Sequence, residues 1–273
     1  MEFTPSEIMV VCIAHQIQDG ETVVQGIATP LVAAGYLLAR QTHAPHIYFA
    51  SAIGGGMCRQ PAPLGLTRVE SLWLDRSLRN MGFAQIATQV LPTLRPKEFF
   101  RPAQVDPSGS TNNIAFGKNY LTDGRQHPRL RLPGSAGIPD VTTFISHICL
   151  YVPRHSRLTF VPHLDVCSGL GHTPARKQGT GPIYLVTDLG QFDFAGGLMR
   201  LTTFHPGVTI EHIQAHTGFE FDIAPTIHET PPPSVNEIRL LREELDPLNI
   251  RQLELLSGAP RRQLLSQILA KEQ

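Results

Sequence analysis

The sequence predicts an α/β fold built on an open, mostly parallel sheet, and three observations lead to this prediction. Apolar, strand-like segments alternate with helix-like segments along the chain. Residues 22–51 follow the order strand, helix, strand, which makes two parallel strands joined by a crossover. After His147 the strand-like segments follow one another closely, so antiparallel pairs are expected in that half.

The first helix is predicted to begin at Pro5. Thr4 before it is a good capping residue, and proline fits the first helical position because its missing N–H has no partner there. Glu7 stands where a capping box needs an acidic side chain. The opening segment is therefore expected to be helical.

The next stretch predicts a βαβ unit. A strand over Thr22–Gln25 leads into Gly26, and a helix begins at Pro30. The helix has an apolar stripe made by Leu31, Ala34, Leu37 and Leu38. It ends at His43-Ala44-Pro45, before a second strand within His46–Ser51. The carboxyl ends of the two strands are expected at one sheet edge, where ligands of α/β sheets bind.

The turn after the first strand is the main candidate for chemistry. Its residues are Gly26, Ile27, Ala28 and Thr29. Backbone N–H groups in such a turn are able to hold an oxygen that gains negative charge during a reaction. An alternative stays open, namely that the small residues serve only to make a tight turn.

The other elements are expected in the following order. Helices are predicted over 69–81, 84–94, 209–217, 237–245 and 261–271, the last one loosely attached. Strands are predicted over 98–100, 147–152, 158–161, 183–188 and 199–204, and the chain passes through turn residues at 108–113 and a small-residue loop at 133–137. We expect one large domain over residues 1–250 and a C-terminal helical extension over 251–273.

Composition argues against several classes of protein. Lys and Arg number 23, as do Asp and Glu, so no net charge favours nucleic acid or an anionic membrane. No segment approaches the ~18 apolar residues of a spanning helix, and the N-terminal residues lack signal-peptide character. The cysteines are scattered, as in a reduced protein: Cys12, Cys58, Cys149 and Cys167. We therefore expect a cytoplasmic protein.

Three motifs resemble known sites without matching them. His212 and His216 lie one helical turn apart, but Ile213 stands where a metalloprotease helix needs glutamate, so a partly exposed helix is favoured over a metal site. Gly117-Lys118 lacks the other residues of a P-loop. Gly54-Gly55-Gly56 lacks the third glycine of a dinucleotide fingerprint. No metal is expected.

Several segments together resemble one family in their order and spacing. They are Gly26–Pro30, Thr42–Pro45, Ala103–Pro107, Gly109 with Asn112-Asn113, Gly134–Gly137, Leu185–Gly190, Phe192–Phe194, His205–Gly207, Thr217–Phe219 and Ile238–Pro247. The chain resembles the β subunit of class I CoA-transferases, most closely that of the glutaconate CoA-transferases. The similarity runs from about residue 7 to 246.

The resemblance implies a fold, a partner and a binding site. The fold is the CoA-transferase (NagB/RpiA-like) fold, an open sheet with helices on both faces. The partner is an α-type subunit, in a heterotetramer of two α and two β chains. No cofactor is implied apart from the CoA carried by the substrate. The residues expected to face the CoA thioester are Gln104, Asp106, Asn112, Asn113, Gly134, Ser135, Ala136 and Gly137.

One position departs from the family pattern. The nucleophilic glutamate of the true transferases corresponds to Ala50, which is followed by Ser51. A methyl group is unable to form the glutamyl thioester through which those enzymes transfer CoA. The chain in this respect resembles two glutamate-less branches, the methylglutaconyl-CoA decarboxylases and the steroid ring-cleaving CoA hydrolases. Ser51 and Cys58 are near the vacant position in sequence, although simple packing roles are favoured for both.

The resulting hypothesis is an enzyme subunit acting on an acyl-CoA thioester with a second carboxylate or ketone. Decarboxylation of the glutaconyl- or methylglutaconyl-CoA type, or C–C hydrolysis, is preferred because of Ala50. The alternatives are a conventional CoA-transferase that uses another nucleophile, and a non-catalytic partner that binds CoA esters.

Overall fold

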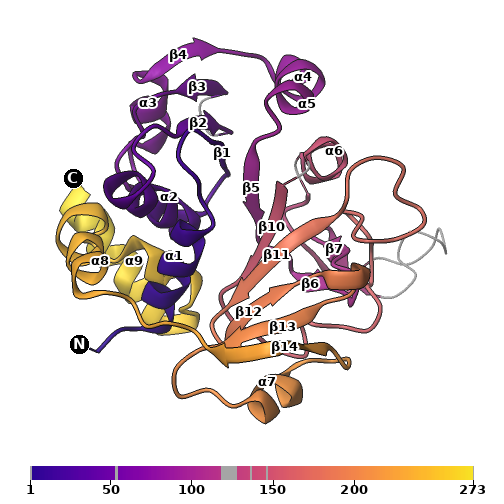
Figure 1. The fold of residues 1–273 in the computed structure, drawn as a ribbon. Helices are drawn as coiled ribbons and strands as arrows, with labels where there is room; N and C mark the ends of the chain where they lie inside the picture. The colour runs from indigo at the N-terminus through magenta and orange to yellow at the C-terminus, as the bar shows by residue number, and fades with distance from the viewer. Residues whose placement is uncertain (1, 53–54, 118–127, 136, 146, 273) are drawn as a thin grey trace. The chain divides into compact units, whose positions relative to one another are not determined.

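The computed structural model describes residues 2–52, 55–117, 128–135, 137–145 and 147–272 (Figure 1). The chain divides into two compact units. Residues 1–90, 96–98 and 232–273 form the first unit, and residues 91–95 and 99–231 form the second. Within the described residues, none of the helices has both the length and the apolar character needed to cross a bilayer.

Two helices of the first unit pack closely against each other. In α1 (Pro5–His15) the predicted capping box is present, with Thr4 and Glu7 in reciprocal hydrogen bonds. α2 (Pro30–Thr42) begins and ends as predicted. Gly35 makes the close packing possible, because a Cβ at this position would lie 2.5 Å from the Ile13 side chain.

The sheet of the first unit has the strand order β5-β1-β2-β3-β4. The strands are β1 (Thr22–Gln25), β2 (Tyr48–Ser51), β3 (Gly56–Cys58), β4 (Ser77–Asn80) and β5 (Lys97–Phe100), whose last two residues belong to the second unit. β1 runs parallel to β2 and β5, which confirms the predicted βαβ unit, while β2–β3 and β3–β4 are antiparallel.

The remaining helical segments of the first unit lie between and after these strands. They are α3 (Val69–Leu74), α4 (Phe83–Gln85), a π-helical turn (Ile86–Val90), α8 (Val235–Leu240), a second π-helical turn (Leu241–Leu245), a 3₁₀ turn (Ile250–Glu254) and α9 (Gly258–Glu272). The prediction of a helix over 69–81 is wrong in its second half. Arg76 donates to the carbonyls of Trp73 and Leu72, which ends α3, and the chain then pairs with β3 as a strand.

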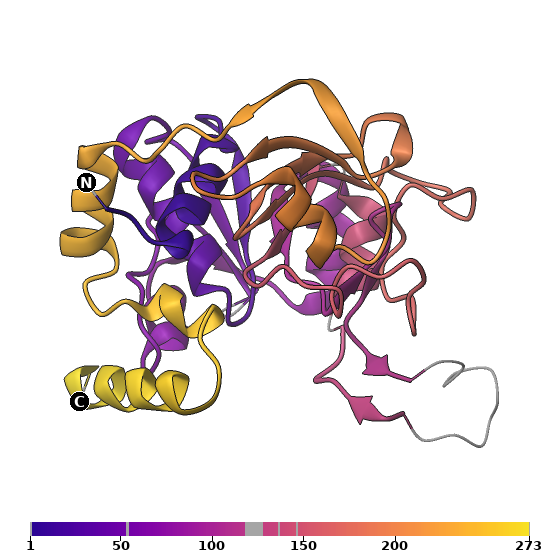
Figure 2. The same cartoon turned by 90° about the horizontal axis from the view of Figure 1, so that it is seen from below.

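α9 is firmly attached to the first unit, contrary to the expectation of a loose helix. Ile268 packs with Ile250 and Leu253 in a buried apolar cluster. The Glu272 carboxyl accepts hydrogen bonds from the backbone N–H groups of Leu66 and Thr67 at 2.8–3.1 Å. Both chain ends therefore belong to the first unit, with α9 in yellow in Figures 1 and 2.

The second unit carries the strand order β10-β11-β12-β13-β14. Its elements are α5 (Leu91–Leu94), β6 (Gln104–Val105), β7 (Thr111–Asn112), β8 (Ala115–Phe116), β9 (Leu130–Arg131), α6 (Ile138–Phe144), β10 (His147–Val152), β11 (Pro182–Thr187), β12 (Gly190–Asp193), a 3₁₀ turn (Ala195–Gly197), β13 (Arg200–Phe204), α7 (Ile210–His216) and β14 (Asp222–Glu229). β10–β11 and β13–β14 are parallel, whereas β11–β12 and β12–β13 are antiparallel as predicted. The open, mixed α/β sheet confirms the predicted fold class.

Three local predictions for the second unit need correction. Leu158–Val161 forms no regular strand, because the Ser156 carbonyl accepts from the N–H groups of Thr159 and Phe160 and bends the chain into a turn. Residues 108–113 are only partly turn, because Thr111–Asn112 pairs with β6. β14 was not predicted, since Pro225 and its polar neighbours hide the strand pattern.

Candidate functional site

The loop between β1 and α2 is closed by hydrogen bonds among its own residues. The Thr29 hydroxyl donates to the Gly26 carbonyl at 3.3 Å. The buried Gln25 side chain donates to the Gly26 carbonyl at 3.2 Å and to the Thr29 hydroxyl at 3.3 Å. Ile27 is 68% exposed at the tip. The loop is therefore a defined turn whose outer face is open.

The backbone of this loop offers donors. Ala28 has a φ of 54°, a left-handed conformation that non-glycine residues adopt at a cost of about 1–2 kcal/mol. Among the hydrogen bonds of the described residues, none is donated by the N–H groups of Gly26, Ile27, Ala28 or Thr29. These donors remain available to a ligand, as an oxyanion-binding turn requires.

The end of β2 lies beside this loop. Val24 pairs with Ala50 and Gln25 pairs with Ser51 in the parallel ladder, and the Ala52 N–H donates to the Gln25 carbonyl at 2.9 Å. Ala50 and Ser51 are 7% and 3% exposed. The fold thus brings together the two segments that the sequence analysis singled out in the first unit.

Cys58 is packed into the core of the first unit. Its side chain is fully buried, and its thiol donates to the Trp73 carbonyl at 3.7 Å. Burial raises the pKa of the thiol, so that the reactive thiolate is disfavoured. Gly54, from the neighbouring glycine run, lies outside the described residues.

Three of the predicted binding residues in the second unit are engaged in the protein's own hydrogen bonds. Asn112 is fully buried and donates to Gln104 Oε1 at 2.7 Å. Gln104 Oε1 also accepts from the Asp165 N–H at 3.1 Å. Asp106 Oδ1 accepts from the backbone N–H groups of Ser108 and Ser110 at 2.9 and 3.0 Å. These side chains shape the β6–β7 hairpin.

Two other predicted residues, Asn113 and Gly134, line a cavity of about 700 Å³ in the second unit. Asn113 donates from Nδ2 to the Arg101 carbonyl at 2.8 Å, and its buried Oδ1 has no hydrogen-bond partner among the described residues. The remaining lining residues are Arg101, Pro102, Ala103, Phe116, Leu132, Pro133, Val152, Pro153, Arg154, Ser156, Leu158 and Thr159. The volume lies within the range of small-molecule sites.

The cavity combines apolar walls with two arginines. Arg101 and Arg154 are exposed side chains at its lining, together with the 76% exposed Leu158. Such a surface suits a ligand with an apolar body and anionic groups. Sequence reasoning missed Arg154 and Leu158, although the position of Arg154 directly after the strand 147–152 is a signal that would have found it.

The last predicted segment opens α6. The Ser135 carbonyl accepts from the Ile138 N–H, and Gly137 stands at the helix N-cap, where its carbonyl accepts from the Val141 N–H. Ala136 lies outside the described residues.

Two buried histidines of the second unit serve its structure. His155 lies between the hydroxyls of Thr187 and Thr217, at 3.1 and 2.9 Å, and stacks on Phe160. Burial lowers the pKa of His155 to about 3. His205 contacts Thr230 and the Thr187 carbonyl, and burial lowers its pKa to about 4. Both rings are neutral at physiological pH and belong to the packing of this unit.

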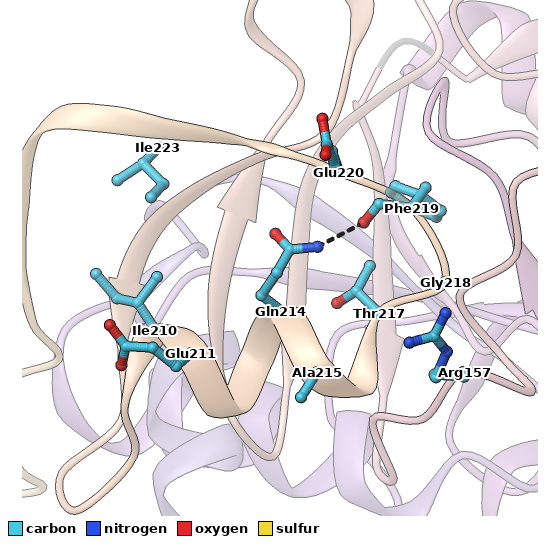
Figure 3. A pocket seen from close by; sticks show the side chains of 10 residues that line it. All are labelled: Arg157, Ile210, Glu211, Gln214, Ala215, Thr217, Gly218, Phe219, Glu220 and Ile223. Atoms are coloured by element: carbon cyan, nitrogen blue, oxygen red, sulfur yellow. Dashed lines mark hydrogen bonds between the residues drawn. The ribbon is translucent and has the colours of Figure 1, made fainter.

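A second cavity, of about 720 Å³, lies along α7 (Figure 3). Gln214 donates to the Phe219 carbonyl at 2.9 Å across it, and Arg157 lies at one side. None of the predicted site residues lines this cavity. His212 and His216 stack with ring centroids 4.2 Å apart, and within the described part of the chain no three His, Cys, Asp or Glu side chains gather as metal ligands.

Comparison with known proteins decides the family. The sequence matches the family described as Coenzyme A transferase over residues 6–216. The chain belongs to the coenzyme A transferase family. In this coenzyme A transferase-family chain, the matched range contains the β1–α2 loop, the end of β2 and the 700 Å³ cavity.

Three relatives illustrate the range of the family. The β-type subunit of glutaconate CoA-transferase from Acidaminococcus fermentans is 28% identical over 263 residues, covering 90% of this chain and 93% of the relative. The cholesterol ring-cleaving hydrolase IpdB subunit of Mycobacterium tuberculosis is 30% identical over 266 residues, covering 93% and 99%. The crystal structure of the decarboxylase AibA/AibB superposes with a TM-score of 0.78 at 30% identity, covering 92% and 98%.

Proposed function

We propose that this chain is the β subunit of a heteromeric enzyme that acts on an acyl-CoA thioester bearing a second carboxylate or ketone. The proposed reaction is decarboxylation of a glutaconyl- or methylglutaconyl-type thioester, or hydrolysis of a C–C bond. The observation that carries the proposal is the pairing of Ala50 with Val24, one residue before Gln25 and the open loop. The β2 side chain beside this edge is a methyl group, which offers no carboxylate for a covalent CoA adduct.

The relatives support this choice without deciding it. They include transferases, a hydrolase and a decarboxylase in similar folds at 28–30% identity. A family scaffold that retains a donor-lined loop, without a carboxylate at the end of β2, fits the latter two chemistries better. These two reactions need a stabilised thioester oxygen but no nucleophile on this chain.

In the proposed decarboxylation, the bond between the substrate chain and its carboxylate breaks and CO₂ leaves. The electron pair moves through the conjugated chain to the thioester oxygen. N–H groups of Gly26–Thr29 stabilise that oxygen, as preorganised donors do in oxyanion holes. A proton from water then completes the product, and CoA stays attached throughout.

In the proposed C–C hydrolysis, the same donors serve a different bond. Water adds to the remote ketone, and cleavage of the adjacent C–C bond leaves its electron pair as a thioester enolate. The ketone carbon becomes a carboxylic acid, and the enolate carbon takes up a proton. Both reactions therefore require the loop and an aligned acyl chain.

We assign the cavity of the second unit to the CoA portion of the substrate. Arg101 and Arg154 match phosphate groups, because guanidinium pairs with phosphate through parallel hydrogen bonds. Asn113 Oδ1 offers an unused acceptor, and Phe116, Leu132 and Leu158 offer apolar contact. CoA enters as part of the substrate, and the proposal includes no separate cofactor and no metal.

The proposed partner is an α-type subunit of the same family, in a complex of two α and two β chains. Support comes from the relatives, which are named as subunits or as two-component enzymes. A contribution of the partner to the acyl pocket accounts for the diversity of reactions among them.

The test is to purify the complex with its α-type partner and to follow CoA esters by mass spectrometry. The substrates are glutaconyl-CoA, methylglutaconyl-CoA and a cyclic β-keto acyl-CoA, each with isotope-labelled acetate as a competing acceptor. We expect a product that has lost CO₂ or gained water while CoA remains attached. Label appearing in acetyl-CoA at a comparable rate identifies a transferase and refutes the proposal.

The alternative of a non-catalytic partner is favoured by the same methyl group at Ala50. It predicts CoA-ester binding by the complex with no turnover of any of the three substrates. A transferase with another nucleophile predicts a covalent adduct. Borohydride treatment with acyl-CoA, followed by intact-mass measurement, is expected to leave this chain unmodified, and a modification at Ser51 or Cys58 would contradict the expectation.

A further inference from the structure

The first turn of α2 lacks a cap from its own sequence. A helix begins with four N–H groups that have no partner within the helix. In α2, Pro30 has no N–H, and the Ala33 N–H already bonds the Thr29 carbonyl at 3.0 Å. Thr29 occupies the N-cap position but makes no side-chain capping bond. The Leu31 N–H is left to find an acceptor elsewhere.

Thr29 fails to cap because its hydroxyl closes the preceding loop. It donates to the Gly26 carbonyl and accepts from Gln25 Nε2. A threonine at this position normally accepts from the second or third N–H of the helix. The loop and the helix therefore compete for one hydroxyl, and the loop has it.

Glu254 supplies the missing acceptor from the other end of the chain. The Leu31 N–H donates to Glu254 Oε1 at 2.9 Å, across a sequence separation of 223 residues. Leu31 is fully buried and Glu254 is 4% exposed. A buried hydrogen bond to a carboxyl group is among the stronger hydrogen bonds in proteins.

The segment that carries Glu254 is itself held in place. Asp246 accepts from the N–H groups of Ile250 and Arg251 at 2.7 and 3.1 Å, which fixes the start of the 3₁₀ turn. Ile250 and Leu253 are buried in the cluster that also contains Ile268 of α9. The carboxyl group is thus presented to α2 by a packed element.

We propose that Glu254 is a positioning residue for the Gly26–Thr29 loop. It satisfies the first free N–H of α2, and so leaves the Thr29 hydroxyl to hold the loop in the form that exposes its donors. The role of the loop as an oxyanion site rests on the proposed function, whereas the coupling between Glu254 and the loop rests on the contacts alone. Without Glu254, Thr29 is drawn toward the helix and releases the Gly26 carbonyl.

The test compares two glutamates that anchor the C-terminal region to the rest of the first unit. Glu254→Ala removes the α2 cap, whereas Glu272→Ala removes the carboxyl that binds Leu66 and Thr67 far along the chain from the loop. Glu254→Gln retains an acceptor oxygen. Each variant is studied in the complex with the α-type subunit, well below its melting temperature.

Two measurements separate this inference from the proposed function. Amide hydrogen exchange of residues 22–34 is expected to be at least ~10-fold faster in Glu254→Ala than in the parent, unchanged in Glu272→Ala and largely restored in Glu254→Gln. The kcat for the acyl-CoA substrate is expected to fall at least ~10-fold in Glu254→Ala with little change in KM, and to stay unchanged in Glu272→Ala.

Equal exchange in the loop of both alanine variants overturns the inference, whatever the activity. Altered exchange without any turnover by the parent complex leaves the coupling intact and refutes the proposed function instead. If Glu254→Ala and Glu272→Ala lower kcat equally, Glu254 has only a structural role and the inference is wrong.

Discussion

At the scale of single residues, the candidate site depends on backbone more than on side chains. The loop after β1 presents N–H groups, and its one unusual conformation is the left-handed backbone of Ala28. The side chain beside the loop edge on β2 is the methyl group of Ala50. Conservative changes at these positions therefore alter geometry without removing a reactive group.

Ala28→Val tests the loop directly. A β-branched residue is strongly disfavoured at a φ of 54°, so the loop shifts and its donors lose alignment. Loss of one oxyanion donor lowers kcat by about 10²–10³-fold, or about 2.7–4 kcal/mol. Ala28→Gly adopts the same conformation freely and is the control. Steady-state kinetics of the complex should show a loss in the valine variant only; equal losses in both would exclude a role for the backbone conformation.

Arg154→Ala tests the cavity assigned to CoA. Arg154 lines the 700 Å³ cavity, whereas the nearby Arg157 lines the cavity along α7. Removal of a charged hydrogen bond to phosphate costs about 1.5–3 kcal/mol, so KM for the acyl-CoA should rise about 10–150-fold. Arg157→Ala should leave KM unchanged. The assignment of this cavity is wrong if the Arg157 variant has the larger effect.

Glu98 of β5 gives a pH-dependent prediction. Its Oε2 is buried without a partner among the described residues, and burial raises the pKa of Glu98 to about 8. The unfolded chain releases this proton near pH 4.5, so between about pH 4.5 and 8 the native state binds more protons and stability falls as pH rises. Glu98→Gln should therefore raise Tm at pH 7.5 and have little effect at pH 4.5. Calorimetry at both pH values checks this, and an equal change at both would contradict it.

At the scale of elements, the first unit is held together by contacts between the two ends of the chain. Glu7 of α1 pairs with Arg242 and Arg251 at 2.7 and 3.0 Å, and Arg251 also pairs with Asp246 at 2.7 Å. Burial opposes ionisation of Glu7, but hydrogen bonds from Arg242 and Thr4 and the charge of Arg251 lower its pKa overall. The same C-terminal segment carries Glu254 to α2.

Arg251→Ala is expected to unfold the first unit more easily. The guanidinium is 1% exposed, so its removal leaves the carboxyl groups of Glu7 and Asp246 buried without their partner. Breaking such a buried pair costs about 3–5 kcal/mol. Urea denaturation should show this loss, and the exposed pair Arg239–Glu244 supplies the control, since Arg239→Ala should cost less than about 1 kcal/mol. A loss below about 1 kcal/mol for Arg251→Ala would mean that the network adds little.

At the scale of the whole molecule, the chain has the fold and the extent of a family subunit. It covers 93–99% of the lengths of the three relatives, so it corresponds to one subunit of each. Nothing in its own described residues supplies a carboxylate beside the loop edge on β2, where Ala50 lies. The proposed partner is where such a group would come from.

We expect the chain alone to be inactive. Co-expression with an α-type subunit should give a stable complex of two α and two β chains, measured by native mass spectrometry, and activity should appear only in that complex. A matched preparation of the α-type subunit alone is the control. An isolated β chain with full activity would refute the shared site.

The sequence by itself determined the elements that depend on neighbouring residues. The capping box at Thr4, the βαβ unit and the α/β class follow from local patterns and were predicted correctly. The family was also recognisable, because its segments keep their order and spacing along the chain. The loop of Gly26–Thr29 and its neighbour Ala50 were found in this way.

Only the tertiary structure decided how distant residues meet. Asn113 and Arg154 share a cavity, and Glu254 caps α2 across 223 residues, because packing and long-range hydrogen bonds leave no periodic signal in the sequence. The strand β14 was hidden for the same reason, since its pairing with β13 outweighs a weak local preference. Gln104 and Asn112 resemble binding residues in the sequence, but the fold turns their side chains toward each other.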